Sequence, residues 1–196
     1  MRDLLVATTN PGKAREIRCV LAGAPVTLVT LADLAKIAPP PPEETGRTFA
    51  ENAALKARYY ARHTGLPTVA EDSGLVIDLL GGRPGIESAR YPGATYTDKF
   101  ANLYRELASY PRPWEARFVC ALAYVDRLGS PFSCEGVVEG EIAAAPSGTG
   151  GFGYDPIFWF PPYGRTLGEA TDAQKLAVSH RGHAFRQFRR WLQSGP

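Results

Sequence analysis

Acidic residues beside an apolar run are the first sign of chemistry in this sequence. Glu71 and Asp72 directly follow residues 68–70, and Glu44 belongs to a second acidic pair that follows a proline run. Mg²⁺ prefers one or two carboxylates, phosphate oxygens and water as ligands, and a nearby carboxylate can deprotonate an attacking water. The two acidic pairs therefore predict a magnesium platform. The alternative is that these acids are solvated surface charges. For Glu43 taken by itself, this alternative is favoured.

A second candidate is the loop between the first expected strand and the first expected helix. Its residues are Thr8, Thr9, Asn10, Pro11, Gly12 and Lys13. Backbone N–H groups at a helix start favour an anion, and Lys13 adds a positive charge. The segment is not a GxxxxGK[ST] phosphate loop. The alternative is an ordinary helix, capped by Asn10 and carrying a surface lysine.

The helix expected from Thr48 offers another cation. Asn52 and Lys56 are one turn apart and therefore share a face, from which Lys56 can reach phosphate oxygens. Glu51 has two readings, because Thr48 and Glu51 also match a capping box.

Two later segments have the chemistry of a base pocket. In the glycine-rich stretch 150–156, Phe152 can stack on a base and Asp155 can bind its polar edge, although an aromatic turn packed on the core is equally compatible. Further on, His180 and Arg181 open a helix after Lys175. Cations at a helix start oppose the dipole, which points to an anionic or carbonyl-rich ligand, whereas His180 alone is more often structural.

These side chains need a scaffold, and the apolar pattern predicts one. Expected strands cover residues 4–7, 26–31, 68–70, 116–125, 132–142 and 157–160, and expected helices begin near residues 11, 48, 98 and 179. Helices and strands alternate early, and a hairpin turning at residues 126–130 comes late. This order predicts an α/β fold with a mixed sheet.

Composition further restricts the class of protein. The 196 residues suit one domain, 1–196, and the net charge of +2 gives no support to a nucleic-acid or membrane partner. The N-terminus lacks the features of a secretory signal, so we expect a cytoplasmic protein. Three scattered cysteines without a Cys-x-x-Cys pair fit reduced thiols rather than a zinc site.

Taken together, the motifs resemble one family, the Ham1-like inosine/xanthosine triphosphate pyrophosphatases. The matching segments, in family order, are residues 7–13, 43–46, 48–53, 55–58, 70–75, 81–91, 150–158 and 179–182. The resemblance implies an elongated mixed β-sheet with flanking helices, and two lobes around a central nucleotide cleft. It also implies a homodimer.

The resemblance further implies a role for each motif. Residues 8–13 and Lys56 would hold the triphosphate, Glu44 and Asp72 would bind Mg²⁺, and Asp72 would accept a proton from water. The remaining substrate contacts would be Ser73, Phe152, Gly153, Tyr154, Asp155, Lys175, His180 and Arg181. Glu71 departs from the two aspartates common in the family, which leaves its role as a ligand open. Thr9 stands where glycine is common.

The expected activity is hydrolysis of ITP, dITP and XTP to the monophosphate and pyrophosphate, which removes deaminated purine nucleotides. Donors such as His180 and Arg181 suit a 6-oxo group and disfavour adenine. Three alternatives remain open: a pyrophosphatase of pyrimidine or modified nucleotides, a nucleotide-binding protein without catalysis, and an RNA-binding module. The Ser-His-Arg-Gly segment favours the purine family over the first, and the retained Glu44 and Asp72 argue against the second. The low net charge gives the third no support.

Overall fold

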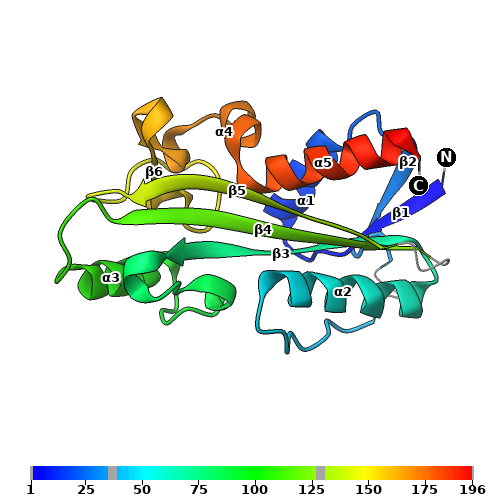
Figure 1. The fold of residues 1–196 in the computed structure, drawn as a ribbon, viewed down its shortest axis with the longest axis horizontal. Helices are drawn as coiled ribbons and strands as arrows, with labels where there is room; N and C mark the ends of the chain where they lie inside the picture. Colours follow the sequence, from blue (N-terminus) through cyan, green and yellow to red (C-terminus); the bar gives the residue numbers. More distant parts are fainter. Residues whose placement is uncertain (1, 35–38, 127–130, 196) are drawn as a thin grey trace. The chain divides into compact units, whose positions relative to one another are not determined.

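The computed structural model describes residues 2–34, 39–126 and 131–195. Within these ranges the strands form one sheet in the order β2-β1-β3-β4-β5-β6-β7 (Figure 1). The strands are β1 (Arg2–Val6), β2 (Val26–Thr30), β3 (Thr68–Ile77), β4 (Glu115–Val125), β5 (Phe132–Ile142), β6 (Phe158–Phe160) and β7 (Arg165–Thr166). β1 pairs in parallel with β2 and β3, whereas β6 pairs antiparallel with β5 and β7. The predicted mixed α/β sheet is confirmed.

The α-helices alternate with the early strands and close the chain. They are α1 (Pro11–Val20), α2 (Phe49–Thr64), α3 (Tyr96–Leu107), α4 (Asp172–Val178) and α5 (His180–Ser194). No helix within the described ranges combines the length and the apolar character needed to cross a bilayer.

The chain divides into two compact units. The first comprises residues 1–72, 120–136 and 180–196, and the second comprises 73–119 and 137–179. β3, β4 and β5 each contribute residues to both units. The expectations of a single domain and of a nucleotide cleft between two lobes stay predictions.

In the first unit, helices cover both faces of the strands. α1 packs against α5 on one face, and α2 lies on the other (Figure 1). The α2 side is built from small residues, with Ala53 and Ala57 fully buried against Leu5 of β1 and Ala70 of β3. Small side chains let a helix approach the sheet closely, which brings the polar residues of α2 near those of β3.

In the second unit, α3 packs onto its own core. Phe100, Leu103 and Leu107 are buried with Leu75 and Phe158, and their spacing places them on one face of the helix. The helix begins two residues before the predicted start at 98, because Thr95 and Asp98 form a reciprocal capping box.

One expected strand ended at the wrong residue, and one α-helix was not predicted. The strand expected over 68–70 continues to Ile77, so Glu71 and Asp72 lie within β3 rather than at its end. β1 pairs with β3 only as far as Val6 opposite Val69, so the acids still lie just beyond the end of β1. α4 was not predicted, because its seven residues carry too short a pattern to read. The turn expected at 126–130 lies largely outside the described residues.

Candidate active site

The loop after β1 is organised by Asn10. Its side-chain oxygen accepts hydrogen bonds from the backbone N–H groups of Gly12 at 2.9 Å and Lys13 at 3.1 Å, and Pro11 occupies the first helical position. The cap therefore uses the amides that an anion would otherwise take. The groups that remain for a phosphate are the side chain of Lys13 and the half-buried to exposed Thr8 and Thr9.

The neighbouring acids of β3 face different helices. Successive side chains of a strand point to opposite faces of its sheet. Glu71 accordingly contacts Lys13 of α1 and Arg181 of α5, whereas Asp72 contacts Lys56 of α2. The two carboxylates do not converge on one point.

Asp72 instead shares its cation with Glu44. The Lys56 ammonium lies 2.7 Å from Glu44 Oε1 and 3.0 Å from Asp72 Oδ1, and Asn52 Nδ2 donates to Asp72 Oδ2 at 3.3 Å. The side chains are 24% exposed for Glu44, 13% for Lys56 and 10% for Asp72. This acidic cluster brings together Glu44 and Asp72, predicted to bind Mg²⁺, and Lys56, predicted to hold phosphate. These roles stay predictions.

Burial shapes the protonation of the acidic cluster. It raises the pKa of Asp72 above the ordinary carboxyl value, although Lys56 opposes the rise. Burial also acts to lower the pKa of Lys56, but the charges of Asp72 and Glu44 outweigh it and the net shift is upward. A carboxylate with a raised pKa is a stronger base, and it lies beside a lysine that stays charged.

Glu71 has a different environment. Lys13 Nζ lies 2.8 Å from Glu71 Oε1, and a guanidinium nitrogen of Arg181 lies 3.4 Å from the same oxygen. Burial acts to raise the pKa of Glu71, but Arg181 and Lys13 outweigh it and hold the pKa well below the ordinary range. Glu71 is therefore a buried anion fixed by two cations.

In the second unit, Asp155 organises the segment predicted to bind a base. It accepts from the backbone N–H of Phe152 at 2.7 Å and from Lys175 Nζ at 2.6 Å. The same ammonium lies 4.1 Å from the centroid of the Phe152 ring. Tyr154 is tied down by its hydroxyl, which donates to the Ser88 carbonyl at 2.8 Å. Phe152, Tyr154, Asp155 and Lys175 are thus brought together.

Gly153 lies between Phe152 and Tyr154 with φ +67°. The other remaining predicted residues lie on β3 and at the start of α5. Ser73 follows Asp72 on β3 and is half-buried. His180 and Arg181 open α5, and both are buried. Arg181 belongs to the first unit, where its guanidinium pairs with Glu16 at 2.7 Å as well as with Glu71.

Comparison with known proteins identifies the family of this chain. A model of the Ham1 family matches residues 4–191. The chain belongs to the Ham1 family. It is 44% identical over 200 residues to a dITP/XTP pyrophosphatase of Escherichia coli strain K12, with all of both chains covered. It is 46% identical to one of Thermus thermophilus, covering 98% of this chain and 93% of that protein. Among solved structures, a HAM1 protein from Coxiella burnetii aligns over 100% of both chains with a TM-score of 0.90 and 38% identity.

Two residues of this Ham1 chain contact the cluster or its neighbours without having been assigned a site role. Asn52 donates to Asp72, and its own oxygen accepts from the Gly46 N–H at 2.8 Å. Its position one turn before Lys56 was the available signal. Glu16, the partner of Arg181, carried no signal, because the two residues are 165 positions apart. Glu51 is structural: its N–H donates to Thr48, and its carboxylate accepts from Arg47 rather than completing the box with Thr48.

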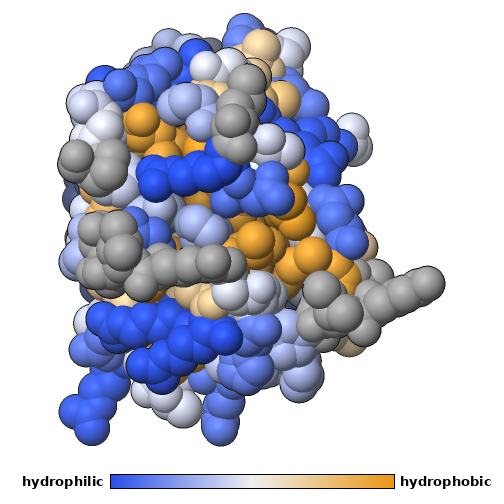
Figure 2. Space-filling model, turned by 90° about the vertical axis from the view of Figure 1, so that its right-hand side faces the viewer, coloured by the Kyte–Doolittle hydropathy of each residue, from blue (hydrophilic) through white to orange (hydrophobic). Residues whose placement is uncertain are grey.

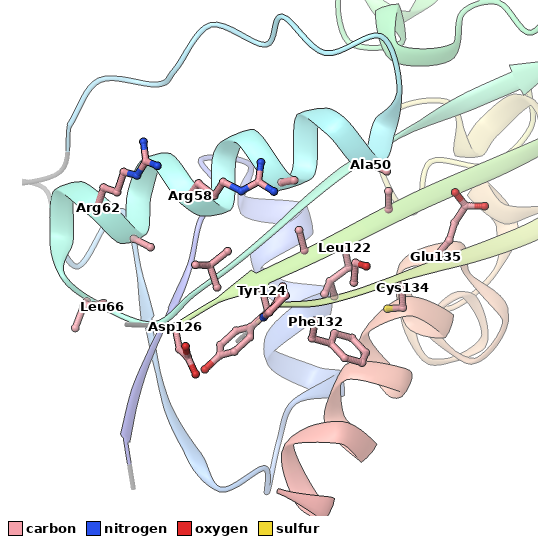
Figure 3. Close-up of a pocket in the computed structure, with 17 residues that line it drawn as sticks. Ala50, Arg58, Arg62, Leu66, Leu122, Tyr124, Asp126, Phe132, Cys134 and Glu135 are labelled. Atoms are coloured by element: carbon pink, nitrogen blue, oxygen red, sulfur yellow. The ribbon is translucent and has the colours of Figure 1, made fainter. Parts of the chain in front are cut away.

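α2 of this Ham1 chain also borders a groove away from the acidic cluster. The groove has a volume of about 790 Å³ and lies between Arg58 and Arg62 of α2 and a wall that includes Tyr124 and Phe132 (Figure 3). The residues of the cluster are not among the described residues that line it. Figure 2 shows the first unit from the right-hand side of Figure 1, where apolar surface lies between hydrophilic side chains. A second hollow, of about 700 Å³, is bordered by residues 8–11, where the candidate phosphate loop lies.

Proposed function

We propose that this chain hydrolyses the triphosphates of deaminated purine nucleosides, namely ITP, dITP and XTP, to the monophosphate and pyrophosphate. The observation that carries the proposal is the convergence of Glu44 and Asp72 on Lys56. The chain belongs to a family whose members include proteins named dITP/XTP pyrophosphatase.

The acidic cluster has the donor set for Mg²⁺. Glu44 and Asp72 both contact one cationic atom, the Lys56 nitrogen, so the two carboxylates face the same point. Two carboxylates with phosphate oxygens and water are a typical Mg²⁺ environment. Pyrophosphatases of the family generally depend on a divalent metal, and we assign Mg²⁺ to Glu44 and Asp72. When bound, the ion offsets charge on the phosphates.

Asp72 acts as the general base. It accepts a proton from a water molecule whose oxygen attacks the α-phosphorus. The bond from the α-phosphorus to the bridging oxygen breaks, and pyrophosphate leaves with that oxygen. Lys13 and Lys56 pair with neighbouring acids of β3 just beyond the end of β1, where both can offset the negative charge of the phosphates. Thr8 and Thr9 supply further phosphate contacts.

The segment around Asp155 recognises the base. Lys175 is a donor without acceptor capacity, so it suits a 6-oxo group and leaves a 6-amino group facing an unpaired donor. Phe152 lies beside this ammonium and is assigned a stacking contact with the purine. Ser73, Gly153, Tyr154 and His180 are assigned to the same substrate, whereas the buried Arg181 acts through its pairs with Glu16 and Glu71. We also propose that the chain forms a homodimer. Its mass in solution, measured by light scattering coupled to gel filtration, tests this.

Pyrophosphate release from ITP, dITP, XTP, GTP, ATP, dUTP and TTP, with and without Mg²⁺, tests the proposal. We expect Mg²⁺-dependent release from the three deaminated purine nucleotides and little from the others. Release from dUTP or TTP instead would reassign the chain to pyrimidine nucleotides. Absence of release from every nucleotide would leave a binding protein without catalysis.

A further inference from the structure

The Glu71 carboxylate is fully engaged by the protein. Its Oε1 faces both Lys13 Nζ and Arg181, and its Oε2 lies 3.5 Å from the Cys120 sulfur, whose thiol donates. The side chain is 2% exposed. An ion bound by Glu71 would have to displace these partners.

The geometry of β3 also separates Glu71 from the acidic cluster. Asp72 and Glu44 meet at Lys56 on the α2 side, whereas Glu71 contacts residues of α1 and α5. Because adjacent residues of a strand face opposite sides, a single ion held by Glu44 and Asp72 would lie on the face of β3 opposite to the Glu71 carboxylate.

The partners of Glu71 form a chain of alternating charge. Lys13, Glu71, Arg181 and Glu16 follow one another through contacts of 2.8, 3.4 and 2.7 Å. The side chains of Glu71 and Arg181 are 2% and 1% exposed, whereas that of Lys13 is 20% exposed. Lys13 is therefore the cation of the chain that combines a buried anchor with access to solvent. Its ammonium carries three donors, so it can keep Glu71 and still bind a phosphate oxygen.

We infer that Glu71 is a positioning residue: together with Arg181, it fixes the Lys13 ammonium for a phosphate of the substrate, and it takes no part in binding the metal. This rests on the proposed function, which supplies the triphosphate. Fixing a flexible lysine before binding removes part of the entropy that binding would otherwise cost. The role of Glu71 is then exerted on binding rather than on the proton transfer at Asp72.

Glu71→Gln keeps the shape of the side chain and removes its charge. We expect the affinity for inorganic tripolyphosphate, measured calorimetrically without metal, to fall at least about tenfold, as for loss of a charge-assisted contact. With ITP, KM rises by about as much while kcat stays within about threefold. The Mg²⁺ concentration for half-maximal activity stays that of the wild type, whereas Glu44→Gln raises it. The matched control is Glu106→Gln, which breaks an ion pair with Arg83 in the second unit and should leave all three readouts unchanged.

A raised Mg²⁺ requirement in Glu71→Gln would make Glu71 a metal ligand and overturn the inference. Unchanged tripolyphosphate affinity, or no binding by the wild-type chain, would overturn it as well. If Glu71→Gln does not fold, Glu71→Asp replaces it, because the shorter carboxylate cannot hold both Lys13 and Arg181. The effect of Glu71→Asp on tripolyphosphate affinity should vanish when Lys13 is also replaced by Met. Additive effects of the two substitutions would contradict the inference.

The two proposals fail separately. Tripolyphosphate binding requires no turnover, so weakened binding in Glu71→Gln supports the inference even if the wild type hydrolyses no nucleotide. Hydrolysis of ITP by the wild type, with Glu71→Gln indistinguishable from it, overturns the inference and leaves the proposed function standing.

Discussion

The Lys56 ammonium lies 3.0 Å from the Asp72 carboxylate, on the face of β3 opposite to Glu71. Lys56 keeps the carboxylate in a fixed position and limits the rise in its pKa that burial causes. Asp72 is thereby held in place without losing its capacity to accept a proton.

Asp72→Asn should abolish most turnover while the protein remains folded. The amide cannot accept a proton from water, and loss of a general base costs about 10²–10⁴-fold in kcat. The measurement is pyrophosphate release from ITP under saturating Mg²⁺, with circular dichroism as the check on folding. Turnover close to that of the wild type in a folded variant would remove Asp72 from the role of base.

Lys175→Met should reduce the preference for ITP over ATP. The change removes the donor proposed to face the 6-oxo group, and we expect the ratio of kcat/KM values to fall about tenfold or more. Lys175 and Asp155 are 4% and 3% exposed, so the variant also leaves a buried carboxylate without its cation, at about 3–5 kcal/mol.

Lys99→Met is the control for this loss of stability. Lys99 is another buried lysine of the second unit, and it donates to the Ala89 carbonyl at 2.6 Å. We expect Lys99→Met to lower the melting temperature and keep the nucleotide preference. If Lys175→Met also keeps that preference, Lys175 does not contact the base.

Gly151→Ala should disturb the Asp155 pocket. Gly151 has φ +69°, and a Cβ there would collide with the Asp155 carboxylate. Besides about 1–2 kcal/mol for a left-handed backbone, the substitution should raise KM for ITP because Asp155 must move. Gly164→Ala separates the two effects, since Gly164 has φ +59° but nothing within 4 Å of its Cβ position. Equal KM values in the two variants would show that displacement of Asp155 is unimportant.

Thiol labelling should distinguish the three free cysteines. Cys19 is exposed, Cys120 is buried and Cys134 is half-buried. Burial raises the pKa of Cys134 to about 11 and that of Cys120 well above the ordinary value. A raised pKa keeps a thiol protonated, so at about pH 8 an aromatic disulfide reagent should label only Cys19 quickly. Labelling of Cys134 should accelerate as the pH rises toward its pKa, and equal rates at all three sites in the folded protein would contradict this.

Short-range patterns determined most of the elements and the family. The cap at Asn10, the helix start after Thr48 and the apolar runs are local features, so they could be read directly. β3 was cut short because residues 71–74, which are polar or glycine, interrupt its apolar residues, and a strand buried on both faces does not show the usual alternation. The site motifs were found because each is contiguous, and their order along the chain identified the family.

Tertiary structure decided which of these residues act on one another. Glu44, Lys56 and Asp72 meet across separations of 12 and 16 residues, and Arg181 reaches Glu71 across 110. No local pattern encodes such pairs, because they depend on how α1, α2 and α5 pack on the sheet. The sequence shows Glu71 and Asp72 as a pair, but the alternation of β3 sends them to opposite faces. The helices on those faces then hold one as a buried anion and leave the other with a raised pKa.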